Sequence, residues 1–201
     1  DGSFDYGVLS SAIKILGKKN SKSFLINIGA QIGSTCIPAI KNNYFKNLIA
    51  FEPAKKTFRL LKANIFLNGI EDRTKIYNLA LSNKKTNLHL GERIESNIGS
   101  SRILSKKQKN SEIVKSDILD NYTNGLNRNN SLIFMDAEGH EPYILLGAKK
   151  TLKKRIPIVF EFAPKILDKH WLKNLSIVFK NYNFFYDLQS QSLKKEKFNK
   201  K

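Results

Sequence analysis

Cysteine is nearly absent from this sequence: Cys36 is the only one among 201 residues. One cysteine cannot form an intrachain disulfide or build a zinc cluster, so both are excluded within the chain. Long apolar runs are absent as well. The longest, such as Ile156–Phe162, fall far short of the roughly 20 residues of a membrane-spanning helix and have the length of a buried strand. These absences predict a protein of a reducing compartment, the cytoplasm. The chain begins at Asp1 rather than Met, as a fragment would.

Acidic residues are scarce beside basic ones: 17 Asp and Glu stand against 35 Lys and Arg, for a formal net charge of +18. A basic surface attracts polyanions such as nucleic acid, acidic glycans or anionic lipid headgroups. Arginine, whose planar guanidinium suits phosphates and base edges, is a small minority of these cations. An excess of Lys, Asn and Ile is also what an AT-rich genome produces without selection for a partner. A nucleic-acid partner therefore stays open but is not favoured.

The length and the 41% hydrophobic content allow one domain with a substantial core and are too small for two. We expect a single domain over residues 1–201. Its expected parts are a helical lead-in over 1–23, a core over 24–162, a variable loop over 83–112 inside that core, and a basic tail over 194–201.

Strand-like and helical patterns alternate along the chain. Short continuous apolar runs predict buried strands, at 24–28, 48–51, 75–78, 132–135, 156–162 and 184–188. Apolar residues at helical spacing predict helices, at 8–16, from Ser34 onward, at 55–68, 142–154 and 171–182, with a short one near Leu119-Asp120. Residues 83–112 are polar and predicted to be irregular, apart from a short strand at 88–90. Continuous apolar strands alternating with helices predict an α/β fold with a mainly parallel sheet covered on both faces.

The first motif is a glycine turn, Asn27–Gly33, directly after the first predicted strand. Gly29 allows a sharp turn and Gly33 allows the next helix to pack closely, so that backbone N–H groups point into the crevice at the strand ends. A dinucleotide site needs Gly-x-Gly-x-x-Gly, where a pyrophosphate touches bare backbone. Gln31 and Ser34 occupy the second and third glycine positions here. The motif disfavours NAD and nucleotide-sugar chemistry and suits a ligand without phosphates, while a purely structural turn explains it equally well.

Glu52 follows the strand predicted at 48–51 and lies 23 residues after Gly29. A carboxylate at this point can accept hydrogen bonds from both hydroxyls of a ribose and repels a 2′-phosphate. The alternative is a surface glutamate that caps the helix after Pro53. Together with the glycine turn, Glu52 favours ribose binding.

The densest group of titratable residues is the segment 136–142, Asp-Ala-Glu-Gly-His-Glu-Pro, after the strand predicted at 132–135. Three acids and a histidine at the carboxyl edge of a sheet exceed what a solvated loop needs. Capping of the helix that Pro142 opens accounts for Glu141 and one other acid. The same helix start would help keep His140 neutral. The segment therefore predicts catalytic groups.

In their order along the chain, these motifs resemble the FkbM-type methyltransferases, a class I family that depends on S-adenosylmethionine and acts largely on oxygen. The resemblance covers residues 24–162. It rests on Asn27–Gly33, Ala50-Phe51-Glu52-Pro53, Leu61-Lys62-Ala63-Asn64, Leu119-Asp120, Met135–Glu141, Leu146-Gly147-Ala148, and Pro157 with Glu161. The chain departs from the family pattern at Asn27, Gln31 and Phe134, where Asp, Asn and Lys are usual. Asn27 can still form hydrogen bonds but supplies no negative charge.

The resemblance implies a Rossmann-like fold with an antiparallel C-terminal strand, and S-adenosyl-L-methionine as the cofactor. Nothing in the motifs demands a metal. The implied cofactor-binding residues are Asn27, Gly29, Ala30, Gly33, Glu52, Pro53, Ala80, Leu81 and Asp136. The implied catalytic groups are Asp136, Glu138 and His140, any of which could act as a base. The expected reaction is O-methylation of a sugar, a glycan or a small metabolite, with residues 83–112 selecting the acceptor.

Two other functions stay open. A nucleic-acid methyltransferase suits the charge, but the sequence lacks the Asn/Asp-Pro-Pro-Tyr/Phe motif of amino methylation, and Cys36 falls in a predicted helix rather than at a strand end. A cofactor-binding module that has lost catalysis suits the departures at Asn27 and Phe134.

Overall fold

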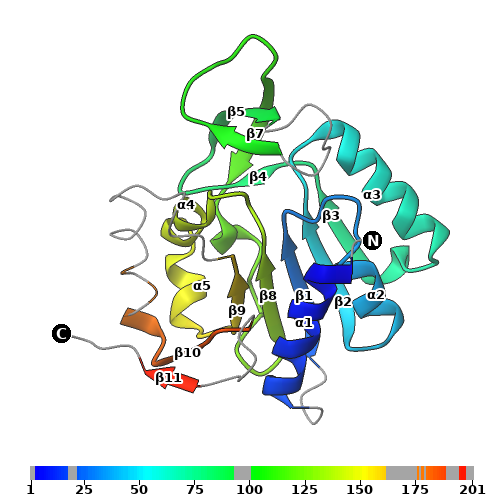
Figure 1. Ribbon diagram of the computed structural model, residues 1–201, viewed down its shortest axis with the longest axis vertical. Helices are drawn as coiled ribbons and strands as arrows, with labels where there is room; N and C mark the ends of the chain where they lie inside the picture. The colour runs from blue at the N-terminus through cyan, green and yellow to red at the C-terminus, as the bar shows by residue number, and fades with distance from the viewer. Residues whose placement is uncertain are drawn as a thin grey trace.

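The computed structural model is built around a parallel sheet. It describes residues 3–17, 22–92, 101–161, 176, 178, 180–188 and 195–197. The central sheet has five strands in the order β3-β2-β1-β8-β9, and every neighbouring pair is parallel. The strands are β1 Lys22–Ile28, β2 Phe45–Phe51, β3 Thr74–Tyr77, β8 Ser131–Met135 and β9 Ile158–Phe160. The chain moves outward from β1 in one direction and later returns to its other side, so the order reverses between β1 and β8 (Figure 1).

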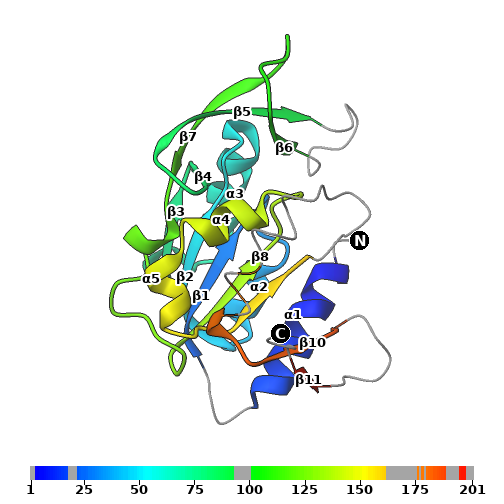
Figure 2. The same ribbon diagram turned by 90° about the vertical axis from the view of Figure 1, so that its left-hand side faces the viewer.

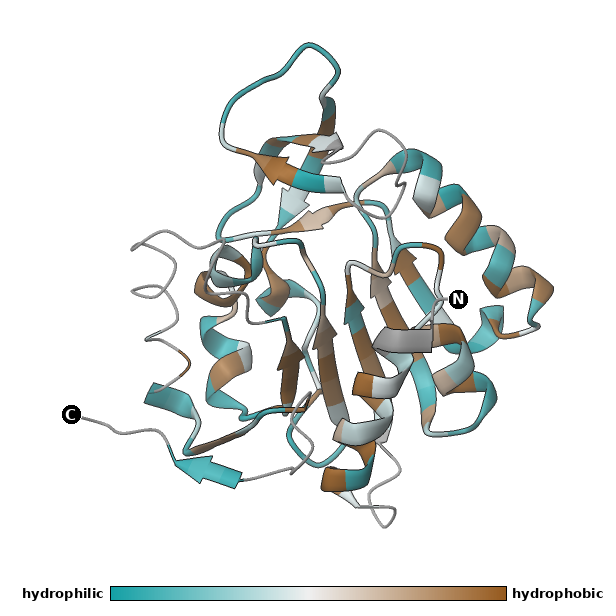
Figure 3. Cartoon of the chain, in the orientation of Figure 1, coloured by the Kyte–Doolittle hydropathy of each residue, from teal (hydrophilic) through white to brown (hydrophobic). Residues whose placement is uncertain are grey.

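Helices cover both faces of this sheet, as Figure 2 shows. They are α1 Ser3–Leu16, α2 Cys36–Lys41, α3 Lys55–Leu67, α4 Glu141–Leu146 and α5 Lys149–Lys153, with short 3-10 turns η1 Glu71–Arg73 and η2 Leu119–Asn121. Alternate strand residues point to opposite faces: Leu25 packs with the helices α1, α2 and α3, whereas its neighbour Ile26 packs with α4 and α5. β8 is buried throughout and β2 is buried from Leu48 onward, so both faces of these stretches are covered, and they are largely apolar (Figure 3). The predicted α/β architecture is confirmed. None of the described helices is long and apolar enough to cross a membrane.

The single helix predicted over 142–154 is wrong, because the chain breaks it into α4 and α5 at Gly147. A Cβ atom at Gly147 would lie 2.1 Å from the carbonyl oxygen of Ser82, so only glycine permits this approach. The N–H groups at the start of α5 then find a hydrogen-bond acceptor in another part of the chain. The Asp120 carboxylate accepts hydrogen bonds from the N–H groups of Lys150 at 2.9 Å and Thr151 at 2.8 Å.

A second sheet lies beyond the carboxyl ends of the central strands, at the top of Figure 1. Its order is β4-β7-β5-β6. The strands are β4 Ala80–Leu81, β5 Thr86–Glu92, β6 Ser101–Leu104 and β7 Glu112–Asp117. Leu90 and Val114 pack on Ala54 and Ala80 to give this sheet its own small apolar cluster. The prediction of an irregular segment over 83–112 is therefore wrong for much of its described part.

The C-terminal part adds an antiparallel pair of strands, β10 Phe184–Tyr186 and β11 Lys195–Lys197. The pair forms a two-stranded sheet separate from the central one. It confirms an antiparallel strand near the C-terminus and places part of the predicted basic tail in β11. The helix predicted over 171–182 lies largely outside the described residues.

Candidate functional site

The candidate site is a crevice at the carboxyl ends of β1, β2 and β8, where the strand order reverses. A larger cavity is lined by the end of β1, the end of β2, the segment after β8 and the second sheet. A smaller cavity is lined from the other side of the glycine turn, with Asn27, Ser34 and Thr35 among its residues. Gly29, Gln31 and Asp136 line both cavities, so the two adjoin. Open α/β sheets bind their ligands at this position.

Gly29 brings the end of β1 against the segment after β8. Its φ angle is +74°, and a Cβ atom there would lie 1.8 Å from the carbonyl oxygen of Asp136. No other residue fits, which explains this glycine. Gly33 has a different role. It is buried and lines neither cavity. A Cβ atom there would meet the side chains of Ile37 and Leu61. Gly33 thus shapes the packing of α2, whereas the neighbouring Ala30 lines the smaller cavity.

Glu52 is a buried carboxylate, only 5% exposed, in the wall of the larger cavity. Its Oε2 accepts a hydrogen bond from the Gln31 N–H and its Oε1 accepts one from the Ala54 N–H, each at 2.9 Å. Burial raises the pKa of Glu52 to about 7, although these two bonds oppose the rise. The alternative of a surface glutamate that caps the following helix is therefore wrong about the exposure of Glu52, although the bond to the Ala54 N–H does lie at the start of α3. Each oxygen has accepted one hydrogen bond within the described chain and can accept another.

The segment after β8 carries Asp136, Glu138 and His140 into the wall of the larger cavity. The Asp136 N–H donates to the Ile28 carbonyl at 3.0 Å, which ties the segment to the end of β1. Pro53, Ala80 and Leu81 line the same cavity, so predicted residues from four separate parts of the chain meet there. Asn27 and Ala30 line only the smaller cavity.

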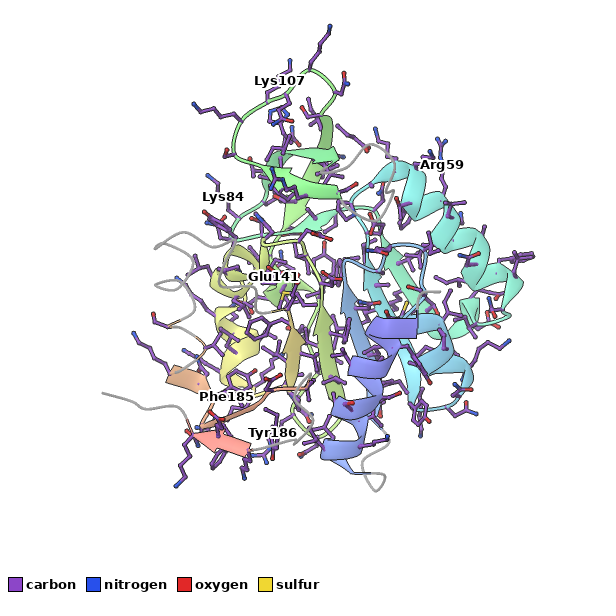
Figure 4. All side chains as sticks on the ribbon, viewed as in Figure 1. Arg59, Lys84, Lys107, Glu141, Phe185 and Tyr186 are labelled. Atoms are coloured by element: carbon purple, nitrogen blue, oxygen red, sulfur yellow. The ribbon has the colours of Figure 1, made fainter. Side chains whose placement is uncertain are left out.

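Glu141, which is labelled in Figure 4, instead supports the segment through a hydrogen bond. It is 1% exposed, and its Oε1 accepts a hydrogen bond from the Ala137 N–H at 2.7 Å. Burial raises its pKa. Glu141 lines neither cavity. It holds the preceding loop in place, which agrees with a structural interpretation for this one acid of the cluster.

His140 is neutral at physiological pH. Its Nε2 lies 3.0 Å from the Ser82 Oγ, and its ring stacks on Tyr143 with 4.9 Å between centroids. Burial lowers the pKa of the imidazole to about 4. The sequence predicted the direction of this shift from the helix start, but the cause that dominates is desolvation.

Asn27 is a buried residue among those that line the smaller cavity. The residue is 2% exposed, and its Nδ2 donates to the Phe134 carbonyl at 3.5 Å. Its Oδ1 is buried and has no hydrogen-bond partner among the residues that the structure describes. A buried acceptor without a donor is costly, so this atom suits a ligand that brings one.

Sequence reasoning missed several residues of the larger cavity. They are Phe51, Thr57, Leu79, Leu90, Ser101 and Ile103 among others. Leu90 lies in the short strand predicted at 88–90, but nothing local indicates that this strand faces the strand ends of another sheet. Within the described ranges no cluster of three or more His, Cys, Asp or Glu side chains is arranged to hold a metal ion.

Comparison with known proteins identifies one family and several solved structures that are similar to this chain. The model of the methyltransferase FkbM domain matches residues 27–186. A crystal structure of the methyltransferase FkbM from Methylobacillus flagellatus superposes with a TM-score of 0.53 at 16% identity, covering 78% of this chain and 38% of that one. The precorrin-6y C5,15-methyltransferase from Geobacter metallireducens gives a TM-score of 0.48 at 11% identity, covering 89% and 72% of the two chains. No curated protein is significantly similar. The chain thus spans well under half of the Methylobacillus protein.

Proposed function

Because the chain belongs to the FkbM methyltransferase family, we propose that it transfers a methyl group from S-adenosyl-L-methionine to a hydroxyl of a sugar, a glycan or a small metabolite. The observation that carries the proposal is the buried Glu52 carboxylate beside the glycine turn, with acceptor capacity left on both oxygens. A carboxylate at the end of the second strand suits the two hydroxyls of a ribose.

The residues of the crevice fit the rest of this cofactor. Asn27 offers a buried Oδ1 acceptor that suits the ammonium group of the methionine end. Gly29 and Ala30 provide room for the same end. Ala80 and Leu81 present buried apolar surface for the adenine. When bound, S-adenosylmethionine supplies a methyl group on a positively charged sulfur, so the protein contributes mainly positioning and electrostatics.

The acceptor side of the site is the segment after β8. Asp136 lines both cavities and therefore suits contact with the cofactor and the acceptor alike. Glu138 and His140 line only the larger cavity, which suits contact with the acceptor. A base positioned at the nucleophile contributes about 10²–10⁴-fold to such a reaction.

Selection of the acceptor belongs to residues 83–112 in this proposal. Leu90 of β5, and Ser101 and Ile103 of β6, reach the larger cavity from the second sheet. They come from a part of the chain that supplies no predicted cofactor contact, so they can change without loss of the cofactor site.

Calorimetric titration with S-adenosylmethionine tests the proposal. We expect one site per chain and weakening of about 100-fold in Glu52→Ala, since two hydrogen bonds to a charged group are lost. Glu71→Ala, which removes an exposed acid in η1, is the matched control and should leave the affinity unchanged. Absence of binding to the wild-type chain would refute the proposal. Binding without methyl transfer to any of a panel of sugar and metabolite hydroxyls would instead favour a non-catalytic module.

A further inference from the structure

Ser82 is a buried hydroxyl that the proposed function leaves without a role. It follows β4, is 2% exposed, and contacts the one histidine of the larger cavity. Its backbone is fixed on two sides: its N–H donates to the Asp117 carbonyl at 2.9 Å, and its carbonyl lies against Gly147. The position of the Ser82 hydroxyl is therefore set by the fold.

Two hydrogen bonds orient the proton of this hydroxyl. The Ser82 Oγ lies 3.4 Å from the Asn83 Oδ1 and 3.0 Å from the His140 Nε2. An amide oxygen can only accept, so the hydrogen bond between Ser82 and Asn83 uses the single Ser82 proton. The lone pair of Oγ then faces His140, and a hydrogen bond between the two requires the proton to be on Nε2.

A neutral imidazole carries only one proton, so its location at Nε2 leaves Nδ1 unprotonated. Burial keeps the ring of His140 neutral. Within the described part of the chain, Nδ1 has no hydrogen-bond partner, while the residue itself lines the larger cavity. The one nitrogen able to accept a proton is thus the one that the described residues leave available.

We infer that Ser82 is a positioning residue that holds His140 in the Nε2–H tautomer, so that Nδ1 accepts the proton of the acceptor's nucleophile. In that step the O–H bond of the acceptor breaks, an N–H bond forms at Nδ1, and the electron pair stays on oxygen. The acceptor therefore carries a neutral hydroxyl at the reacting position. A carboxylate or a phosphate has no proton to donate there at neutral pH and would face the acids Asp136 and Glu138. The proton transfer from the acceptor to Nδ1 rests on the proposed function, whereas the tautomer of His140 does not.

Nitrogen-15 NMR of the full chain, labelled at histidine, tests the tautomer without cofactor or acceptor. His140→Gln identifies the signal among the three histidines. We expect the proton on Nε2, protected from exchange with solvent. Ser82→Ala should speed that exchange about tenfold or more, whereas Ser82→Thr retains the hydroxyl and should preserve protection. A proton on Nδ1 in the wild-type chain overturns the inference.

A second pair of variants keeps the test valid if changes at the buried Ser82 impair folding. Asn83 is exposed, so its replacement is tolerated more readily. Asn83→Asp retains an obligate acceptor and should leave the proton on Nε2. Asn83→Ala frees the Ser82 hydroxyl to donate to Nε2 and should increase the fraction with the proton on Nδ1. Equal tautomer populations in the two variants would contradict the orienting role of Asn83.

Turnover then tests the catalytic consequence with the hydroxyl acceptor found in the panel. Ser82→Ala should lower kcat roughly tenfold to a hundredfold, leave the Kd of S-adenosylmethionine unchanged, and be rescued by Ser82→Thr. A loss that lies wholly in cofactor affinity would overturn the inference. If the cofactor binds but the proton is on Nδ1, this inference fails and the proposed function stands. If the tautomer is as expected but the cofactor does not bind, the proposed function fails.

Discussion

Protonation of Glu52 should weaken cofactor binding as the pH falls through neutrality. Burial raises its pKa to about 7, so the carboxyl group titrates in an experimentally convenient range. A ribose hydroxyl donates its hydrogen to a carboxylate more favourably than to a neutral carboxylic acid, because hydrogen bonds to charged acceptors are the stronger ones. S-adenosylmethionine should therefore select the ionised form and lower the pKa of Glu52 when it binds.

The size of the effect follows from the pKa. With a value of about 7, roughly one tenth of the Glu52 side chains are ionised at pH 6 and roughly nine tenths at pH 8. If only the ionised form binds, the apparent Kd rises about tenfold between pH 8 and pH 6, which is about 1.4 kcal/mol. His140 does not interfere, since its pKa lies near 4.

Calorimetry at half-unit steps between pH 5.5 and pH 8.5 measures this dependence. Glu52→Gln serves as the control: it should bind weakly and show a flat profile over that range. A wild-type affinity that does not change with pH would refute the reasoning, and so would a Glu52→Gln profile as steep as that of the wild-type chain.

The same group makes folding stability depend on pH, with a defined sign. The folded-state pKa of Glu52 lies above the ordinary value of 4.5, so its stabilising contribution is complete below pH 4.5 and is lost as the pH rises to about 7. The shift corresponds to about 3 kcal/mol. His140 has the opposite sign below pH 6.5, because its pKa is lowered. The difference between the urea stabilities of wild type and Glu52→Gln should therefore reveal the slope, and a constant difference would contradict it.

Three further changes probe separate parts of the fold. Gly29→Ala should destabilise the chain by about 3 kcal/mol in urea, because its Cβ atom would overlap the Asp136 carbonyl at 1.8 Å and its φ is +74°; wild-type stability would show that the contact relaxes freely. Asp120→Ala should lower the free energy of unfolding by about 1–2 kcal/mol through loss of the α5 cap, with the urea m-value unchanged. A decrease below about 0.5 kcal/mol would show that Asp120 does not stabilise the start of α5. Ile103→Ala should enlarge the cavity and broaden the range of hydroxyl acceptors without altering the Kd of S-adenosylmethionine; an unchanged range would argue against a role of the second sheet in selection.

The central sheet and the location of the site could be predicted from local patterns. Continuous apolar runs indicate strands that are buried on both faces, and parallel strands end at a common edge. Glu52 and Asp136 directly follow such runs, so their meeting at one crevice follows from the alternation of strands and helices. The predicted strands agree with β1, β2, β3, β8 and β9 to within a few residues.

The errors occurred where distant contacts outweigh local preference. The run 142–154 has good helical periodicity, yet α4 ends where Gly147 meets the Ser82 backbone, and Asp120 caps a new helix. Polar composition over 83–112 suggested a loop, but pairing of β5 with β6 and β7 satisfies that backbone. The Ser82 backbone and the Asp120 carboxylate lie outside the run 142–154, and most of β7 lies outside the segment 83–112.

The sequence alone determined which residues stand at the strand ends, because a two-residue side-chain period and continuous apolar runs define where each strand is buried and where it stops. Only the tertiary structure decided their chemical state. Glu52 has a raised pKa because the surrounding elements exclude water, and His140 is paired with Ser82, which lies 58 residues earlier in the chain. Desolvation and hydrogen-bond partners depend on distances between segments that only packing brings together.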